Sequence, residues 1–310
     1  MGGDMTLEEA RSEDAILNSF ESAPNLTSVD ICFANRFFPI ETFKFPWWNF
    51  TSVVIDCVAL IHVKPIMVLC PKLEEAIFRC SWDDRDETDG ILPERSQLYA
   101  NNKLRAFSLS YSPFDDDVSV IFMHTWVIPS LSTLGLENIQ DHEITAMLQL
   151  SHCRTLRDLS LHQGWWTSVE LFRLFRNTPL LTELLLWDNK KSENTFEDWL
   201  LRRLTYPEPG ASNFREQLLP RLERFQYLPP ESCTIDGNVM ANMITSRSRS
   251  SPSGVAALRA GMAVLVRAHF GKRVQEGYPM LNDSSMKKLE KAQSEGMDVV
   301  VEGFMSKRSN

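Results

Sequence analysis

The sequence lacks several features that define common protein classes. No apolar run approaches the ~20 residues that a helix needs to span a bilayer. The first residues, MGGDMTLEEARSED, have neither the basic nor the apolar region of a secretory signal. None of the six cysteines forms a CxxC pair, and most lie beside apolar runs, so we expect small buried side chains in a reducing compartment. These absences favour an intracellular protein, cytoplasmic or nuclear, that does not enter a membrane.

Excess positive charge is missing as well. The chain carries 32 basic and 41 acidic residues, which gives a formal net charge of −9. Only residues 245–310 are mildly basic, and the rest of the chain is strongly acidic. An acidic body argues against general nucleic-acid binding, which needs a basic surface, and it favours protein partners.

The motifs of common enzymes are also absent. The chain contains no GxGxxG, P-loop, HExxH or GxSxG sequence. His142, His152 and His162 are spaced by ten residues, which is not the i, i+4 spacing of metal ligands on a helix. The acidic run from Asp83 to Asp89 lacks the ligand order of a calcium loop. We therefore expect no enzyme activity, no cofactor and no metal site.

What the sequence does contain is a recurring L-x-x-L-x-L pattern. Residues 156–162 read LRDLSLH and residues 181–187 read LTELLLW, with leucines at the same places. Five of the seven intervals between successive patterns fall in the leucine-rich-repeat range of roughly 20–29 residues. With other apolar residues allowed, the pattern begins at Leu26, Phe50, Leu73, Leu104, Leu131, Leu156, Leu181 and Leu222.

The pattern predicts a strand followed by a return segment. In five of the units, proline stands two residues before the first apolar position, where we expect it to end the preceding helix. The last two apolar residues of each unit should point inward from a short strand. Thr167 and Glu170 are spaced as a capping box, and an apolar stripe follows them, which indicates a return helix. The predicted fold class is α/β: a leucine-rich-repeat-like solenoid with one curved parallel sheet and return helices on its convex side.

The chain divides into a repeat body with shorter segments on either side. Composition and pattern together set the predicted boundaries. In order, these segments are an acidic N-terminal segment or helical cap (1–22), the solenoid (23–244) with an acidic insertion (81–95) and a loop (206–217), a Ser/Arg linker (245–254), and a C-terminal cap with a final helix and strand (255–310).

Several blocks of sequence resemble a known family. They are the P-x-L-x-x-L-x-L units, LLRRLTY, LLPRLERFQYL, NVMANMITSR and the closing LEKAQSEGMDVVV. Together they resemble the C-terminal region of fungal F-box proteins, particularly those of mushroom-forming fungi, over about residues 15–303. The resemblance implies that the repeat arc receives the substrate of a cullin-RING ubiquitin ligase, while an F-box binds a Skp-type adaptor.

The F-box itself is not recognisable in this chain. About two dozen residues precede the first repeat, and they show no Leu-Pro-x-Glu opening. We therefore expect residues 1–310 to provide a non-catalytic recognition module and not to bind the Skp-type adaptor themselves. The alternative is a leucine-rich-repeat scaffold or regulator with no connection to ubiquitin ligases.

Strand alternation identifies the side chains that face outward, and there we expect the partner site. Six of the outward charged residues are acidic and two are basic, which predicts a partner of basic character on the concave sheet face. The outward Trp187 is a possible aromatic anchor, whereas the pairs Trp47–Trp48 and Trp165–Trp166 are expected to be buried. The competing interpretation is that the acids only keep an open sheet soluble. The predicted partner-binding residues are Asp56, Glu75, Ile77, Arg79, Glu137, Asp158, His162, Glu183, Leu185, Trp187 and Arg224.

Overall fold

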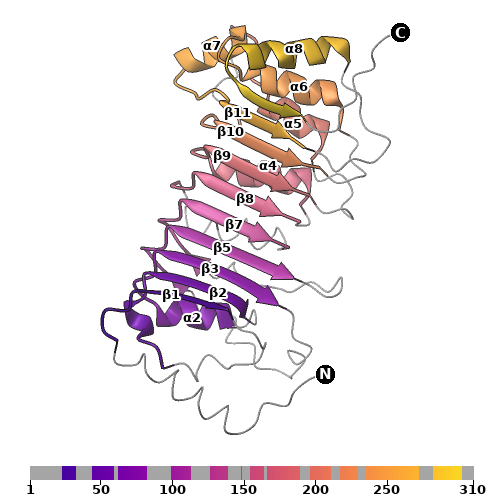
Figure 1. Cartoon of the computed structure of the whole chain (residues 1–310). Helices are drawn as coiled ribbons and strands as arrows, with labels where there is room; N and C mark the ends of the chain where they lie inside the picture. Colours follow the sequence, from indigo (N-terminus) through magenta and orange to yellow (C-terminus); the bar gives the residue numbers. More distant parts are fainter. Residues whose placement is uncertain are drawn as a thin grey trace, which may run out of the picture.

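The computed structural model of the chain is an α/β structure built on one long parallel sheet (Figure 1). The predicted N-terminal cap, nearly all of the 81–95 insertion and the middle of the 206–217 loop lie outside the residues that it describes. The described residues are 23–32, 44–58, 62–81, 99–112, 126–138, 148, 154–163, 166–188, 196–210, 217–229, 235–271 and 282–301.

Strand order in the sheet follows chain order, and every neighbouring pair is parallel. Each of the eight predicted repeats forms one strand, which confirms those predictions. The sheet consists of β1 (Ser28–Cys32), β2 (Ser52–Val58), β3 (Glu75–Ser81), β5 (Ala106–Ser112), β7 (Thr133–Glu137), β8 (Asp158–His162), β9 (Glu183–Trp187), β10 (Arg224–Leu228), β11 (Arg267–Phe270) and β12 (Asp298–Val301).

The described parts of the segments between these strands include helices and a short second sheet. A short second sheet pairs β4 (Tyr99–Ala100) with β6 (Trp126–Val127). Within the described ranges, no helix is long and apolar enough to cross a bilayer. The helices are η2 (Trp47–Asn49), α2 (Val63–Leu69), α4 (Ser168–Asn177), α5 (Asp198–Leu204), α6 (Gly237–Ser246), α7 (Pro252–Arg259) and α8 (Asp283–Ser294).

In-register pairing stacks the inward side chains into two continuous apolar rows. One row includes Leu134, Leu159 and Leu184, which are direct partners across β7, β8 and β9. The other places Leu161 beside Leu186 in the same way. From the second hexamer to the eighth, the first apolar residue, such as Leu156 or Leu181, is fully buried beneath the strand entrance. Each repeat therefore completes the core of its neighbours.

The same turn precedes the strands of all five proline-bearing units, and it explains why proline occurs there. In all five proline-bearing units, the N–H of the first apolar residue donates to the carbonyl three residues back, for example Leu181 N to Thr178 O at 3.1 Å. Proline thus occupies the second position of a β-turn, where its fixed φ is favourable. Before Leu104, which has no such proline, the side-chain oxygen of the buried Asn101 accepts from the N–H groups of Lys103 and Leu104.

Helix boundaries follow the expected capping chemistry. Thr167 and Glu170 form the predicted capping box at the start of α4. The side chain of Asn282 caps α8, and Gly296 just beyond that helix has φ +95°, the left-handed conformation that glycine adopts readily. The predicted closing helix and strand are therefore present as α8 and β12.

Residues 245–254 do not form a linker, so that prediction was wrong. Arg247 is fully buried, and its guanidinium donates to three main-chain carbonyls, of Leu204 at 2.6 Å, Leu218 at 2.8 Å and Leu219 at 3.0 Å. The guanidinium also lies 4.2 Å from the ring centroid of Tyr206. Burial lowers the pKa of Arg247 to about 10, so the group still carries its charge at neutral pH. A single charged side chain therefore fixes this segment to the body.

The sheet also continues past the predicted end of the repeats. Strand β11 belongs to a ninth copy of the hexamer, in which Leu265, Ala268 and Phe270 take the apolar positions. This copy was not among the eight predicted repeats, although the unit that begins at Leu73 also has alanine at that position. The C-terminal cap is thus continuous with the repeat body through the pairing of β10 with β11.

The predictions for cysteine and tryptophan were partly right. Cys70 and Cys80 are buried, and burial raises the pKa of the Cys70 thiol to about 12, whereas Cys32 is exposed. Trp47 and Trp166 are buried, but Trp48 is 56% exposed. Cys57 is half-buried, and Cys153, Cys233 and Trp165 lie outside the described residues.

The stacked rows predict that Leu159→Asp unfolds the chain. Its side chain is 1% exposed between Leu134 and Leu184, so an unpaired carboxylate there should cost more than about 4 kcal/mol. Thermal melting followed by circular dichroism measures the effect. Ser160→Asp, one residue along and on the opposite face, is the matched control and should melt close to wild type. Equal melting of both variants would contradict the assignment of the two faces.

The buried guanidinium predicts that Arg247→Met lowers the free energy of unfolding by about 3 kcal/mol or more, because three main-chain carbonyls each lose a charge-assisted hydrogen bond. Arg249→Met, two residues away and exposed, should change it by less than about 0.5 kcal/mol. Urea denaturation of the two variants makes the comparison. If both behave like wild type, the segment acts as a linker after all.

Candidate partner-binding surface

The sheet has one face turned away from the inward apolar rows, and we call it the open face. Because the strands pair in register, its side chains also form rows across the strands. One row runs through Glu75, Ala106, Thr133, Asp158 and Glu183. All eleven predicted partner-binding residues lie on this face, and none of them is buried.

Ion pairs between neighbouring strands occupy the basic side chains of the open face. Arg79 pairs with Asp56 at 2.5 Å, and Arg224 pairs with Glu183 at 2.9 Å. The guanidinium of Arg267 on β11 lies 2.6 Å from the Asp298 carboxylate on β12. These exposed pairs add little stability, typically about 0–1 kcal/mol each. Their main consequence is that the arginines neutralise particular acids and not others.

Four acids on the described part of the open face remain without an ion pair. They lie on four different strands and include Glu75, Glu137 and Asp158. Glu137 accepts a hydrogen bond from Ser110 at 2.7 Å, and Asp158 accepts one from Thr133 at 3.3 Å. The acid excess predicted from the sequence is therefore smaller than the raw count, but it persists and is concentrated on β1, β3, β7 and β8. The fourth acid of this set is Asp30.

A groove of about 380 Å³ lies in the middle of the open face. Its floor consists of short side chains on β5, β7 and β8, and at Gly135 there is no side chain at all. A Cβ atom added at Gly135 would lie 3.0 Å from the Ser108 hydroxyl, so even alanine would be tight there. Because the flanking strands carry larger residues, the short ones leave a hollow. Together with Gly135, the floor includes Ala106, Ser108, Thr133 and Ser160.

The walls of this groove combine apolar and acidic groups. Ile77 on β3 and Leu185 on β9 face each other across the floor, and both are half-buried. Glu75 stands at one side, and Asp158 with Glu183 at the other. Since Arg224 already neutralises Glu183, the acids that a ligand can use are Glu75 and Asp158. The groove therefore offers apolar contact and two separate negative charges.

A second cluster lies at the carboxyl end of the same strands. The His162 ring nitrogen Nε2 is 2.7 Å from the Ser160 hydroxyl, and the ring lies 5.5 Å from that of Trp187. Burial lowers the pKa of His162, while the charge of Glu137 acts in the opposite direction. A Ser–His pair can generate a nucleophile, but acyl transfer also needs free N–H donors for the oxyanion, and the N–H groups here belong to the parallel ladder. The cluster is better suited to contact than to catalysis.

The structure thus brings together only part of the predicted site. The groove gathers Glu75, Ile77, Asp158, Glu183 and Leu185. Asp158 and Glu183 are direct neighbours across β8 and β9, and Arg224 on β10 is next in line. The other predicted residues do not line the groove: Asp56, Arg79, Glu137, His162, Trp187 and Arg224.

The floor residues Ala106, Thr133 and Gly135 were missed by the sequence analysis. Their signal was available, since short residues occupy outward positions on three successive strands, but the search favoured charged and large side chains. Among the described residues, no group of three or more His, Cys, Asp or Glu side chains is placed to hold a metal ion.

The half-buried imidazole predicts a pH dependence of stability. A folded-state pKa below the ordinary 6.5 means that the unfolded chain binds the proton more readily. His162 should therefore reduce stability as pH falls through about 6.5 towards 5. His162→Gln removes this dependence, so its unfolding free energy relative to wild type should rise between about pH 7.5 and pH 5. A constant difference across that range would show that the ring is solvated as in the unfolded chain.

The comparisons with known proteins do not assign a role to this surface. No protein-family model matches the chain, and a search of curated proteins finds no match either.

Proposed function

We propose that the protein is a non-catalytic recognition module whose open face binds an extended, basic segment of another protein. The observation that supports this most is the groove, where a floor of short side chains lies between two carboxylates that have no cation of their own. Apolar walls at Ile77 and Leu185 supply contact area. A basic segment would neutralise Glu75 and Asp158, the two groove carboxylates that pair with none of the three arginines.

The spacing of the two acids specifies the segment further. Glu75 and Asp158 lie three strands apart in one row, which corresponds to about 14 Å at ~4.8 Å per strand. An extended chain covers that distance in about four residues, at ~3.3 Å per residue. Side chains at i, i+2 and i+4 face the same way. The best ligand then has Lys or Arg at i and i+4, and an apolar residue at i+2 over the floor.

The repeat pattern supports a more specific assignment of fold and role. Eight hexamers at near-regular spacing, each forming one strand of a sheet in chain order, favour a leucine-rich-repeat-type solenoid with the open face on its concave side. The resemblance to fungal F-box proteins extends this to the substrate-binding half of a ubiquitin-ligase adaptor. The second candidate is a scaffold or regulator that uses the same face without a ligase.

Co-purification from the protein's own cells separates these two roles. If a partner is captured through the open face together with a Skp-type adaptor, the adaptor role is supported. If the partner is captured with no Skp-type adaptor, the scaffold role is supported. Loss of capture in an open-face variant is required in both cases.

A peptide series tests the binding proposal directly. The sequence Lys-Ala-Leu-Ala-Lys should bind wild type more tightly than Lys-Lys-Ala-Leu-Ala, which has the same composition and the wrong spacing. Glu75→Gln and Asp158→Asn should each weaken the first peptide by roughly threefold to tenfold, and added salt should weaken it further. Asp30→Asn, on β1 away from the groove, is the matched control and should have little effect. Fluorescence anisotropy measures all of these affinities.

The competing interpretation predicts a different outcome. If the acids serve only to keep the sheet soluble, the double variant Asp158→Lys, Glu183→Lys would aggregate while peptide affinity stayed the same. Under the binding proposal the double variant stays folded, because both side chains are partly exposed, and it loses the peptide. Equal affinity for the two peptides at low and high salt would rule out the electrostatic recognition.

A further inference from the structure

A second pocket of about 380 Å³ lies far from the open face, among helices α6, α7 and α8. Serine side chains from the turn before α7 line one side of it. Two lysines on successive turns of α8 line the other side. These residues define what we call the serine–lysine pocket: Ser248, Ser250, Ser251, Ser253, Lys288 and Lys291.

The pocket is rigidly built. Arg247 anchors the turn from beneath, as described above. The Ser251 hydroxyl oxygen accepts from Gly254 N at 2.8 Å and caps α7. A Cβ atom at Gly254 would lie 1.8 Å from the Ser248 carbonyl oxygen, so only glycine allows the chain to fold back this closely. On the opposite side, Lys288 Nζ donates to the Asn242 side chain of α6 at 2.9 Å. Hydrogen bonds within the chain therefore hold the serine turn and Lys288 on opposite sides of the pocket.

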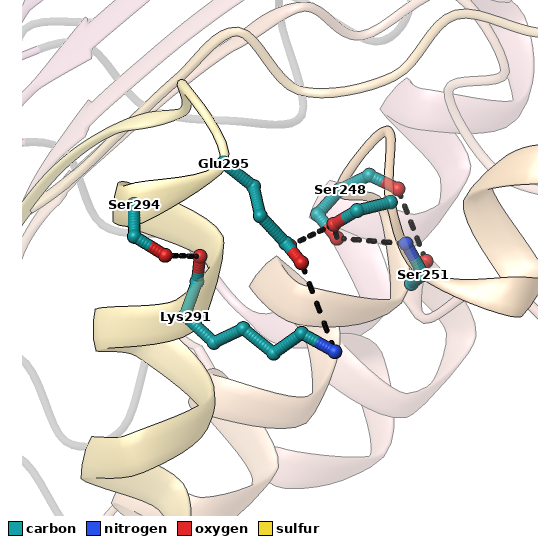
Figure 2. A network of polar contacts seen from close by, with 6 residues as sticks. Ser248, Ser251, Lys291, Ser294 and Glu295 are labelled. Atoms are coloured by element: carbon teal, nitrogen blue, oxygen red, sulfur yellow. Dashed lines mark hydrogen bonds and ion pairs between the residues drawn. The ribbon is translucent and has the colours of Figure 1, made fainter.

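An internal anion now occupies part of this pocket. The Ser250 hydroxyl donates to the Glu295 carboxylate, and Lys291 Nζ lies 3.7 Å from the other carboxylate oxygen (Figure 2). Ser248 and Ser251 lie beside them and bond to one another through Ser251 N and the Ser248 hydroxyl at 3.2 Å (Figure 2). One serine hydroxyl and one ammonium group thus already contact a carboxylate, supplied by the C-cap residue of α8.

We infer that the serine–lysine pocket is a binding site for a phosphate-type oxyanion, with Glu295 as its internal competitor. A phosphate group carries more charge and more acceptor oxygens than a carboxylate, so it can engage the Ser250 hydroxyl and both lysines together. Lys288 and Lys291 are three residues apart on one helix face, which places both ammonium groups within reach of one ligand.

The charge distribution of the chain favours the same ligand class. Most residues that line the pocket lie within residues 245–310, where basic residues exceed acidic ones, although Glu208 of the acidic body also lines it. An anion approaching the acidic repeat body would be repelled, whereas this end attracts it. The ligand is therefore inorganic phosphate or a small phosphate monoester. The inference does not depend on the proposed function of the open face.

A titration of the full chain with inorganic phosphate tests the inference. Amide chemical shifts of Ser250, Ser251 and Ser253 report binding, and chloride keeps the ionic strength constant. Wild type should bind weakly, because Glu295 competes. Glu295→Gln removes the competing charge and should tighten phosphate binding by about tenfold. Lys291→Gln and Lys288→Gln should each weaken it.

The matched control is Lys287→Gln, which makes the same change on α8 at an exposed position outside the pocket and should leave the affinity unchanged. A parallel titration with phenyl phosphate distinguishes the two sources. Binding as tight as that of inorganic phosphate assigns the site to monoesters, and no binding assigns it to the free ion. The inference is overturned if Glu295→Gln binds phosphate no better than wild type, or if Lys287→Gln weakens binding as much as Lys291→Gln does.

Discussion

In-register stacking of the inward side chains is the constraint on which the rest of the structure depends. A strand with two inward residues cannot bury them alone, and each pair is covered only by the pairs on the neighbouring strands. Leu159 between Leu134 and Leu184 illustrates this, since all three are essentially inaccessible to solvent. A slip of one residue in any strand would exchange its faces and open the core on both sides. The apolar hexamer therefore fixes register as well as burial.

The same register organises the open face. Because neighbouring strands are aligned residue by residue, an arginine on one strand lies opposite an acid on the next, as Arg224 does with Glu183. Where no arginine is opposite, as at Glu75 and Asp158, the charge is left for a ligand. The groove has a similar origin, since Ser108 and Gly135 are aligned on adjacent strands and two short residues together leave space. Chemistry and shape on this face thus follow from rows across the repeats, which no single repeat reveals.

This difference explains how much the sequence could predict. The eight strands followed from the hexamer because burial needs only a local pattern of apolar residues. The outward positions followed from alternation. The groove could not be predicted, because it depends on which short residues become neighbours across strands about 25 residues apart. The linker prediction for residues 245–254 failed for another reason. A segment rich in serine and arginine resembles a linker unless the buried carbonyls that accept from Arg247 are known.

Location of a bound peptide tests the central claim most directly. The claim is that the unpaired carboxylates around the groove form the recognition site. Backbone amide shifts of the full chain, recorded with Lys-Ala-Leu-Ala-Lys, should change most on β3, β5, β7 and β8, at residues such as Glu75, Gly135 and Asp158. Shifts that instead cluster on the helices, or that spread evenly over all exposed acids, would contradict the account.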